Sequence, residues 1–233
     1  MNQVVILAGG LATRLQPISS ETPKSLITIS GIPFVKLQIE NLVHLGLTNF
    51  HFCLGSQAIK IEEYLNGRDF AGLNISTSRD SKPNRGTAGA LVDASDYIQE
   101  DFYLTYGDSY LPVDLVSLEK SWANLKSPLK LSVKDVRGTR HLPNIQIEVN
   151  GAFHYGTNLS DTTHIDYGFM KVNKSVISLI KNEGILNFET VIEKMSMSGS
   201  ATCSTTISPL YEIGSFEGII ELESYLGGRN EFY

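Results

Sequence analysis

Glycines and two cationic side chains near the start of the chain form a pattern that could bind a polyphosphate. Gly9 and Gly10 follow an apolar run, Arg14 comes next, and Lys24 stands ten residues after Arg14. Glycines let backbone N–H groups approach an anion because no Cβ atom intervenes, and a planar guanidinium suits phosphate oxygens. The segment is neither a Walker A loop nor G-x-G-x-x-G. The nucleotide contacts expected here are Leu7, Ala8, Gly9, Gly10, Thr13 and Arg14, with Lys24 reaching the same polyphosphate.

Two carboxylates later in the chain could hold a divalent cation. Asp108 follows the strand-like run that ends at Gly107, and Glu212 precedes Gly214 and a predicted helix. Mg²⁺ prefers one or two carboxylates together with phosphate oxygens and water. Asp108 and Glu212 are therefore the predicted Mg²⁺ ligands. An Asp that closes a turn and a surface Glu near a helix start would give the same pattern.

A run of small residues opens a predicted helix and could face a nucleobase. Thr87 is able to cap this helix, and its neighbours can hydrogen-bond the edge of a base. A capped helix that packs closely is the purely structural alternative. The residues expected at the base are Arg85, Gly86, Thr87 and Ala88.

Alternating strand and helix patterns would bring these groups together. The run 4–8 is continuously apolar, as in a central strand of a parallel sheet, and the alternation predicts βαβ units. Open parallel sheets bind ligands beyond the carboxyl ends of their strands, which places Gly9 and Asp108 on one rim. The predicted strands are 4–8, 49–54, 73–77, 102–106, 129–133, 145–149, 152–155 and 165–172. The predicted helices are 35–45, 59–65, 88–98, 175–181, 188–195 and 216–226.

Composition excludes several functional classes. The 233 residues are 42% hydrophobic and 19% charged, with a formal net charge of -6. The sequence has no basic run of the kind that binds nucleic acid. No stretch approaches the roughly 18 apolar residues of a membrane span. The apolar start is too short for a signal peptide, so we expect a cytoplasmic protein. Cys53 and Cys203 lack metal-binding spacing and are expected to be buried free thiols.

In this order the motifs resemble those of the NDP-sugar pyrophosphorylases, the sugar-1-phosphate nucleotidyltransferases. The resemblance runs from about Val4 to Leu226, and its most specific part is G-G-x-x-T-R-L followed by P-K. It implies one nucleotidyltransferase domain over 1–233 with a GT-A-like α/β fold. That fold has a Rossmann-like, mostly parallel sheet flanked by helices and a smaller sugar-binding subregion. Residues 1–112 would mainly bind the nucleotide, and 113–233 mainly the acceptor.

A narrower resemblance connects the chain to short heptose 1-phosphate guanylyltransferases of capsule and surface-polysaccharide pathways. It rests on the segments 106–112, 165–168 and 211–215. It implies that GTP and a sugar 1-phosphate react with Mg²⁺ as the cofactor, giving GDP-heptose. In the same way it implies that Gly107, Asp166 and Gly168 line the sugar pocket.

Three positions depart from the family pattern. Ala12 stands in place of a glycine, and Glu212 in place of an aspartate. The third is Tyr155-Gly156-Thr157, which lacks the lysine that meets the sugar phosphate in relatives. Another cation would then serve, with Arg137, Arg140 and Lys171 as candidates, or the acceptor differs.

The implied reaction is an in-line attack of the acceptor phosphate on the α-phosphorus of the NTP. Arg14, Lys24 and Asp108 would be the catalytic residues, because the step needs positioning and charge neutralisation more than proton transfer. Two alternatives stay open. One is a cytidylyltransferase acting on a non-sugar phosphate, and the other is a non-catalytic nucleotide-binding subunit. The nucleobase, the sugar and the oligomeric state are not specified by the sequence.

Overall fold

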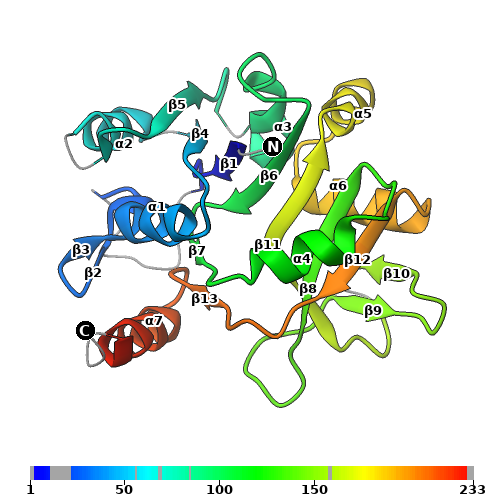
Figure 1. The fold of residues 1–233 in the computed structure, drawn as a ribbon. Helices are drawn as coiled ribbons and strands as arrows, with labels where there is room; N and C mark the ends of the chain where they lie inside the picture. Colours follow the sequence, from blue (N-terminus) through cyan, green and yellow to red (C-terminus); the bar gives the residue numbers. More distant parts are fainter. Residues whose placement is uncertain are drawn as a thin grey trace.

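Apolar strands of the N-terminal half form the parallel part of a large sheet. The computed structural model describes residues 3–10, 22–55, 57–67, 70–83, 85–156 and 159–229. Its strands β1 (Gln3–Leu7), β4 (Asn49–Leu54), β5 (Asn74–Arg79) and β6 (Asp101–Tyr106) are parallel, in the order β6-β1-β4-β5. Helices α1 (Phe34–His44), α2 (Ala58–Leu65) and α3 (Gly86–Asp93) connect them (Figure 1). The predicted βαβ units are confirmed.

The second half of the chain extends the same sheet with mostly antiparallel pairs. Strand β11 (His164–Asn173) runs antiparallel to β6 and also pairs with β8 (Leu129–Asp135) and β9 (Ile145–Ile147). Strand β10 (Phe153–Tyr155) extends β9, and β12 (Ala201–Thr205) is parallel to β8. The result is a nine-stranded mixed sheet.

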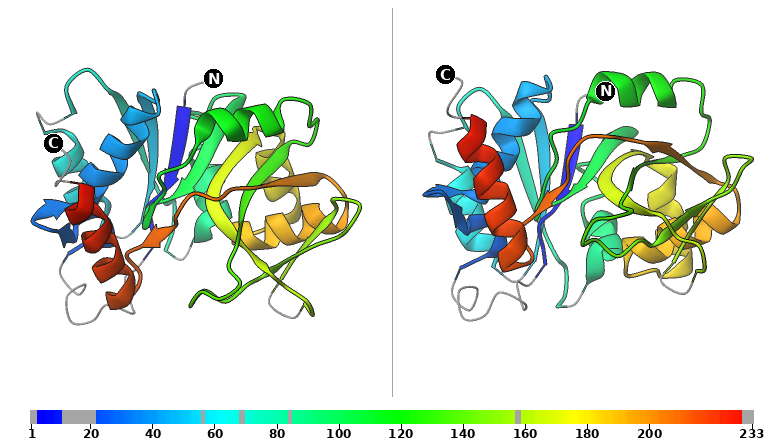
Figure 2. Two further views of the ribbon diagram at one scale, coloured as in Figure 1. Left: turned by 60° about the horizontal axis from the view of Figure 1, so that its bottom comes forward. Right: turned by 90° about the horizontal axis from the view of Figure 1, so that it is seen from below.

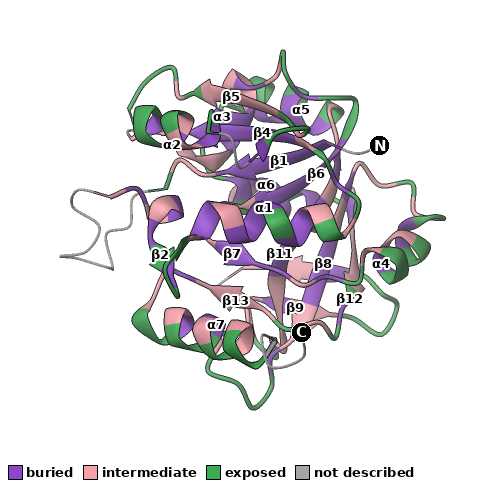
Figure 3. Ribbon diagram, turned by 60° about the vertical axis from the view of Figure 1, so that its left-hand side comes forward, coloured by how far each residue is buried: buried purple, intermediate pink, exposed green. Residues whose placement is uncertain are grey.

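Helices cover both faces of the sheet and bury it. The side chains of β1 alternate between the two faces, as the period of a strand requires: Val4 and Ile6 pack with α1, α2 and α4 (Leu115–Trp122). Val5 and Leu7 pack with α3, α5 (Ser175–Glu183) and α6 (Phe188–Met197). The central strands are accordingly buried (Figure 3). Among the helices of the described ranges, none has the length and apolar content to cross a membrane.

The C-terminal helix returns to the N-terminal half. Helix α7 (Phe216–Arg229) lies beside the hairpin β2 (Thr28–Ile29) and β3 (Ile32–Pro33), as Figure 2 shows. A small apolar cluster there joins Ile29, Ile213 and Leu222. Just before α7, strand β13 (Tyr211–Glu212) pairs with β7 (Ser109–Tyr110). This return brings Glu212 beside Ser109. The division into a nucleotide-binding half and an acceptor-binding half at residue 112 stays a prediction.

Candidate active site

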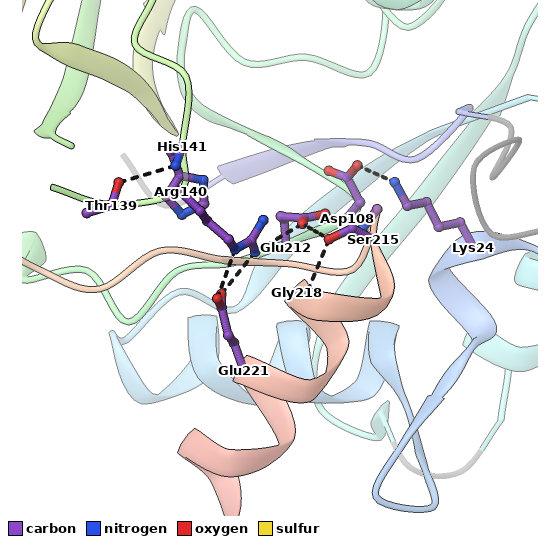
Figure 4. A network of polar contacts seen from close by, with 10 residues as sticks. Lys24, Asp108, Thr139, Arg140, His141, Glu212, Ser215, Gly218 and Glu221 are labelled. Atoms are coloured by element: carbon purple, nitrogen blue, oxygen red, sulfur yellow. Dashed lines mark hydrogen bonds and ion pairs between the residues drawn. The ribbon is translucent and has the colours of Figure 1, made fainter. Parts of the chain in front are cut away.

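Lys24 and Asp108 meet at the carboxyl end of the parallel strands. Lys24 begins a short 3-10 helix (Lys24–Leu26), and Asp108 lies in the turn after β6. The Lys24 Nζ atom donates to Asp108 Oδ2 at 2.6 Å (Figure 4), with 16% and 38% of the two side chains exposed. The structure therefore joins two of the three predicted catalytic residues. Arg14, together with Ala12 and Thr13, lies outside the described residues.

Glu212 reaches the same place through the β7–β13 ladder. Glu212 is paired with Ser109, and the Ile213 N–H donates to the Asp108 carbonyl at 3.0 Å. A Cβ atom on Gly214 would lie 3.0 Å from Lys24 Nζ and 2.7 Å from Glu212 Oε2. A side chain at this position would displace the ends of the Glu212 and Lys24 side chains. Glu212 and Lys24 thus meet at Gly214, and Asp108 joins them through its ion pair with Lys24. Sequence reasoning missed this place of Gly214.

The two carboxylates keep lone pairs for a cation that arrives with phosphate. Glu212 Oε2 accepts the Gly214 N–H, and its Oε1 accepts the Ser215 hydroxyl at 2.5 Å. An ionised carboxylate offers about four lone-pair sites, so Asp108 and Glu212 can each still bind a metal. Within the described residues, His, Cys, Asp and Glu do not gather in threes around a possible ion. A pair of carboxylates suits Mg²⁺ that takes most of its oxygens from phosphate and water.

A cavity of about 500 Å³ opens beside this centre, beyond the ends of β1, β4 and β5. The residues that follow β1 and β4 pack closely and form the floor of the cavity. A Cβ atom on Gly55 would lie 2.4 Å from the Gly9 carbonyl oxygen. In the same way, a Cβ atom on Gly107 would lie 2.7 Å from Ala8 Cα. Six of the predicted nucleotide residues line the cavity, namely Leu7, Gly9, Gly10, Arg85, Gly86 and Thr87.

Arg85 is part of the cavity wall as one half of an ion pair. Its Nε and Nη2 atoms donate to the two carboxylate oxygens of Asp93 at 2.9 and 3.1 Å. Asp93 also accepts the Ser81 N–H at 2.9 Å. Burial opposes ionisation of Asp93, but the hydrogen bonds from Arg85 and Ser81 outweigh it and lower the pKa of that carboxyl. This pair fixes Arg85 in the cavity wall, and its predicted contact with the nucleotide stays a prediction.

The expectation that Thr87 caps its own helix is wrong. The Thr87 hydroxyl accepts the Phe188 N–H at 2.8 Å, so it serves the first turn of α6. The Leu186 carbonyl instead accepts the Ala88 and Gly89 N–H groups at 2.8 and 3.2 Å. Ala88 is fully buried, at 0% exposure, and its N–H is already bonded. The predicted base contact of Ala88 therefore has no free donor, because a neighbouring loop satisfies the start of α3.

Asp166 and Gly168 lie on β11, next to the end of β6. The Asp166 carboxylate accepts the Gly168 N–H at 2.9 Å and the Tyr106 hydroxyl at 3.3 Å. Gly168 has φ +89°, and a Cβ atom there would lie 3.8 Å from Ser109 Oγ. Burial raises the pKa of Asp166 to about 6, and the charge of Glu189 adds to the effect. Tyr106 and Glu189, which sequence reasoning missed, are thus part of the environment of Asp166.

One of the three candidate cations reaches the centre. Arg140 donates through Nη2 to Glu212 Oε1 at 3.4 Å and through Nε to Glu221 Oε1 at 2.8 Å (Figure 4). Arg137 instead pairs with Asp135 in its own turn. Lys171 pairs with Glu119 at 2.7 Å, alongside Tyr103 in the middle of β6. The structure thus separates Arg140 from Arg137 and Lys171.

Known proteins match this chain both in sequence and in structure. A family model described as "Nucleotidyl transferase" matches residues 3–130. Over 128 residues the chain is 30% identical to a D-glycero-alpha-D-manno-heptose 1-phosphate guanylyltransferase of Campylobacter jejuni, covering 55% of this chain and 57% of that enzyme. Over 209 residues it is 26% identical to a "Probable glucose-1-phosphate cytidylyltransferase" of Bacillus subtilis, covering 80% and 81%.

A solved structure has the same fold. HddC from Yersinia pseudotuberculosis, complexed with GMP-PN, matches with a TM-score of 0.81 at 24% identity, covering 97% of this chain and 100% of that one. The predicted α/β architecture is confirmed. The sequence match to the Campylobacter enzyme, in contrast, spans little more than half of that enzyme's length.

Proposed function

Because the chain belongs to the nucleotidyl transferase family, we propose that it joins a nucleoside monophosphate, taken from an NTP, to a sugar 1-phosphate and releases pyrophosphate. The observation that carries this proposal is that Lys24 is paired with Asp108 and lies, together with Glu212, against Gly214. A cation and two carboxylates beyond the carboxyl end of the parallel strand β6 suit a charged phosphate reaction better than acid–base chemistry. The adjacent cavity of about 500 Å³ has room for the nucleoside.

The reaction needs alignment and charge neutralisation. An oxygen of the acceptor phosphate forms a bond to the α-phosphorus, the bond from the α-phosphorus to the bridging oxygen breaks, and pyrophosphate leaves with that electron pair. Lys24 would hold the α-phosphate and the acceptor phosphate near each other, because its ammonium is fixed by Asp108. Asp108 and Glu212 would hold Mg²⁺, which supplies charge neutralisation at the phosphates. The parts given to Thr13 and Arg14, around the leaving pyrophosphate, rest on the sequence motif.

Arg140 is the cation that we assign to the acceptor phosphate. It replaces the lysine that is missing from Tyr155-Gly156-Thr157, of which Thr157 lies outside the described residues. A guanidinium binds phosphate through two parallel hydrogen bonds. Glu221 and Glu212 hold Arg140 beside the reacting centre, so its charge is already in place.

The favoured substrates are GTP and a heptose 1-phosphate, and the product would serve surface-polysaccharide synthesis. The guanylyltransferase relative from Campylobacter jejuni supports this choice. On the acceptor side, Gly107, Asp166 and Gly168 would line the sugar pocket, since a carboxylate accepts hydroxyl hydrogen bonds. A cytidylyltransferase for another phosphorylated acceptor is the second candidate, because a relative matched over 209 residues carries a cytidylyl name.

A pyrophosphate-release screen tests the proposal. The full chain with Mg²⁺ is assayed against GTP, UTP, CTP and dTTP, each crossed with hexose, heptose and non-sugar phosphates. Pyrophosphate released with a sugar 1-phosphate supports the proposal. Release only with a non-sugar phosphate supports the cytidylyl alternative. Nucleotide binding without release on any acceptor would favour a non-catalytic subunit.

A further inference from the structure

The turn that carries Asp108 is supported by elements outside its own strand. Asp108 lies between β6, which ends at Tyr106, and β7, which begins at Ser109. On the side of the sheet, the Gly107 N–H donates to the Leu7 carbonyl at 2.9 Å. The direction in which this short turn presents the Asp108 carboxylate therefore depends on what binds the main chain on either side of it.

The side-chain amide of Gln38, on α1, bonds to both sides of this turn. Its Nε2 atom donates to the Tyr106 carbonyl and to the Ser109 carbonyl, each at 2.8 Å. A carboxamide nitrogen has two donors, so both donors go to the main chain that flanks Asp108. Gln38 is only 2% exposed, and a hydrogen bond shielded from water is electrostatically stronger than one in water.

Asn41 extends this support along the same helix. It lies three residues after Gln38, on the same face of α1, and its Nδ2 atom donates to the Leu111 carbonyl at 2.8 Å. The other buried side chains of α1 are apolar. Both polar side chains of the buried face thus bind the segment 106–111, which contains Asp108.

Helix α1 also supports the segment that carries Lys24. The Phe34 N–H donates to the Ile27 carbonyl at 2.9 Å, and Ile27 directly follows the short helix that begins at Lys24. One helix is therefore bonded to the main chain near each partner of the Lys24–Asp108 ion pair. The relative position of the ammonium and the carboxylate depends on α1 as well as on the ion pair.

The carbonyl end of Gln38 limits what this residue adds to stability. Its Oε1 atom is buried and has no hydrogen-bond partner among the described residues. A buried acceptor that loses water without gaining a partner costs free energy, which offsets part of the gain from the two Nε2 bonds. The main effect of the amide is then on the geometry of the turn.

We propose that Gln38 is a positioning residue, which orients Asp108 towards Lys24 and the metal by fixing the main chain on both sides of the turn. The inference rests on the proposed function for the role of Asp108. Mg²⁺ demands near-ideal octahedral geometry, and a misplacement of about 1 Å at a reacting centre can cost about 100-fold in rate. Gln38 acts only through Asp108, since its amide is buried and bonded to the turn.

The variant Gln38→Met tests the inference in the full chain with Mg²⁺. Methionine has a similar length but no donor, so both bonds to the turn are lost. Pyrophosphate release is measured at varied NTP and at varied sugar 1-phosphate. We expect kcat to fall by about 10- to 100-fold. The KM for the NTP should stay within about two-fold, because the nucleotide cavity is lined by other segments.

Gln3→Met is the matched control. Gln3 is 3% exposed, its Nε2 atom donates to the Tyr97 carbonyl at 2.9 Å, and its Oε1 atom accepts the Gln99 N–H at 2.7 Å. The substitution therefore also removes two hydrogen bonds of a buried glutamine. Gln3 begins β1, so it lies at the opposite end of the sheet from Asp108. We expect Q3M to lower the urea midpoint at least as much as Q38M does and to leave kcat within about two-fold.

Hydrogen exchange measures the turn without any need for turnover. The two amides to follow by NMR are those of Gly107, which donates to the Leu7 carbonyl, and Ile213, which donates to the Asp108 carbonyl. In the unaltered protein both should be strongly protected. We expect Q38M to accelerate their exchange by at least about 10-fold relative to the amides of β4, since the turn opens locally. Q3M should produce no such difference.

Three results would overturn the inference. The first is a kcat of Q38M within two-fold of the unaltered protein. The second is an equal fall of kcat in Q38M and Q3M, which would mean that lost stability explains the effect. The third is rapid exchange of the Gly107 and Ile213 amides in the unaltered protein, a result that needs no variant and no assumption about folding.

The two proposals fail separately. Absence of pyrophosphate release on every acceptor contradicts the proposed function, and the exchange measurement then still decides whether Gln38 holds the turn. Pyrophosphate release with full kcat in Q38M supports the proposed function and contradicts the role of Gln38.

Discussion

The Arg140 guanidinium bridges Glu212 and Glu221, lying 3.4 Å from Glu212 Oε1 and 2.8 Å from Glu221 Oε1. This bridge places a cation beside the proposed metal ligand at the point where the acceptor phosphate would enter. We expect Arg140→Met to lower kcat/KM for the sugar 1-phosphate by about 10- to 100-fold, since one charge-assisted contact is lost. Pyrophosphate release at varied acceptor concentration measures this effect, and the KM for the NTP should change little.

Arg137→Met is the matched control for this prediction. Arg137 is 72% exposed at its side chain and pairs with Asp135. Its removal should leave both kinetic constants within about two-fold, because exposed ion pairs contribute little. Equal effects of the two variants would contradict the role given to Arg140.

We expect ionised Asp166 to lower the free energy of unfolding and to contribute to acceptor binding. Its pKa is raised to about 6 in the folded protein, against about 3.9 in an unfolded chain. The folded state therefore holds this proton more tightly, and stability is lost as the pH rises from about 4 to about 6. We expect Asp166→Asn to increase the free energy of unfolding by up to about 3 kcal/mol at pH 7.5 and to leave it unchanged at pH 4.

Urea unfolding at the two pH values measures this difference. The acceptor KM of the same variant should rise, because a hydrogen-bond acceptor for sugar hydroxyls is weakened. A variant that is equally destabilised at both pH values would show that Asp166 has only a structural role.

Thr87 should stabilise α6 through its hydroxyl. Thr87→Val removes the acceptor of the Phe188 N–H and should cost about 1 kcal/mol of unfolding free energy. Thr87→Ser keeps the hydroxyl and should cost less than half as much. Urea unfolding of both variants checks the prediction, which fails if valine is tolerated as well as serine.

Gly55 should be required for the floor of the nucleotide cavity. A Cβ atom there would lie 2.4 Å from the Gly9 carbonyl oxygen, a backbone atom that cannot rotate away. We expect Gly55→Ala to cost about 1–3 kcal/mol and to weaken GTP binding. The control is Gly228→Ala in α7, where a Cβ atom meets no described atom within 4 Å. It should stabilise the protein slightly. Thermal unfolding separates the two, and a stable Gly55→Ala protein with full affinity would contradict this account.

The parallel half of the sheet could be predicted because most of its strands are apolar runs that can be recognised in the sequence. The apolar runs that become β1, β4 and β6 are buried on both faces. Helix α4 was missed, although Asp114 caps it by accepting the Ser117 N–H at 3.0 Å and its buried residues Leu118 and Trp122 have helical spacing. Strand β12, in contrast, carries little apolar pattern and exists through its pairing with β8.

The site could be predicted only where a residue type and a strand end coincide. Lys24 and Asp108 fulfil the expectation that they meet. The position of Glu212 beside Ser109 depends on a two-residue ladder, which no local pattern specifies. The cap of α6 by Thr87 also joins segments far apart in the chain, so it could not be read locally.

The most direct test of the central claim is the pyrophosphate-release rate of Asp108→Asn at saturating NTP, sugar 1-phosphate and Mg²⁺. Asp108 fixes Lys24 and would hold the metal, so we predict that kcat falls by at least about 100-fold. The melting temperature should change little, because 38% of the Asp108 side chain is exposed. A kcat within a few fold of the unaltered protein would contradict the claim that the reaction takes place where Lys24 and Asp108 meet.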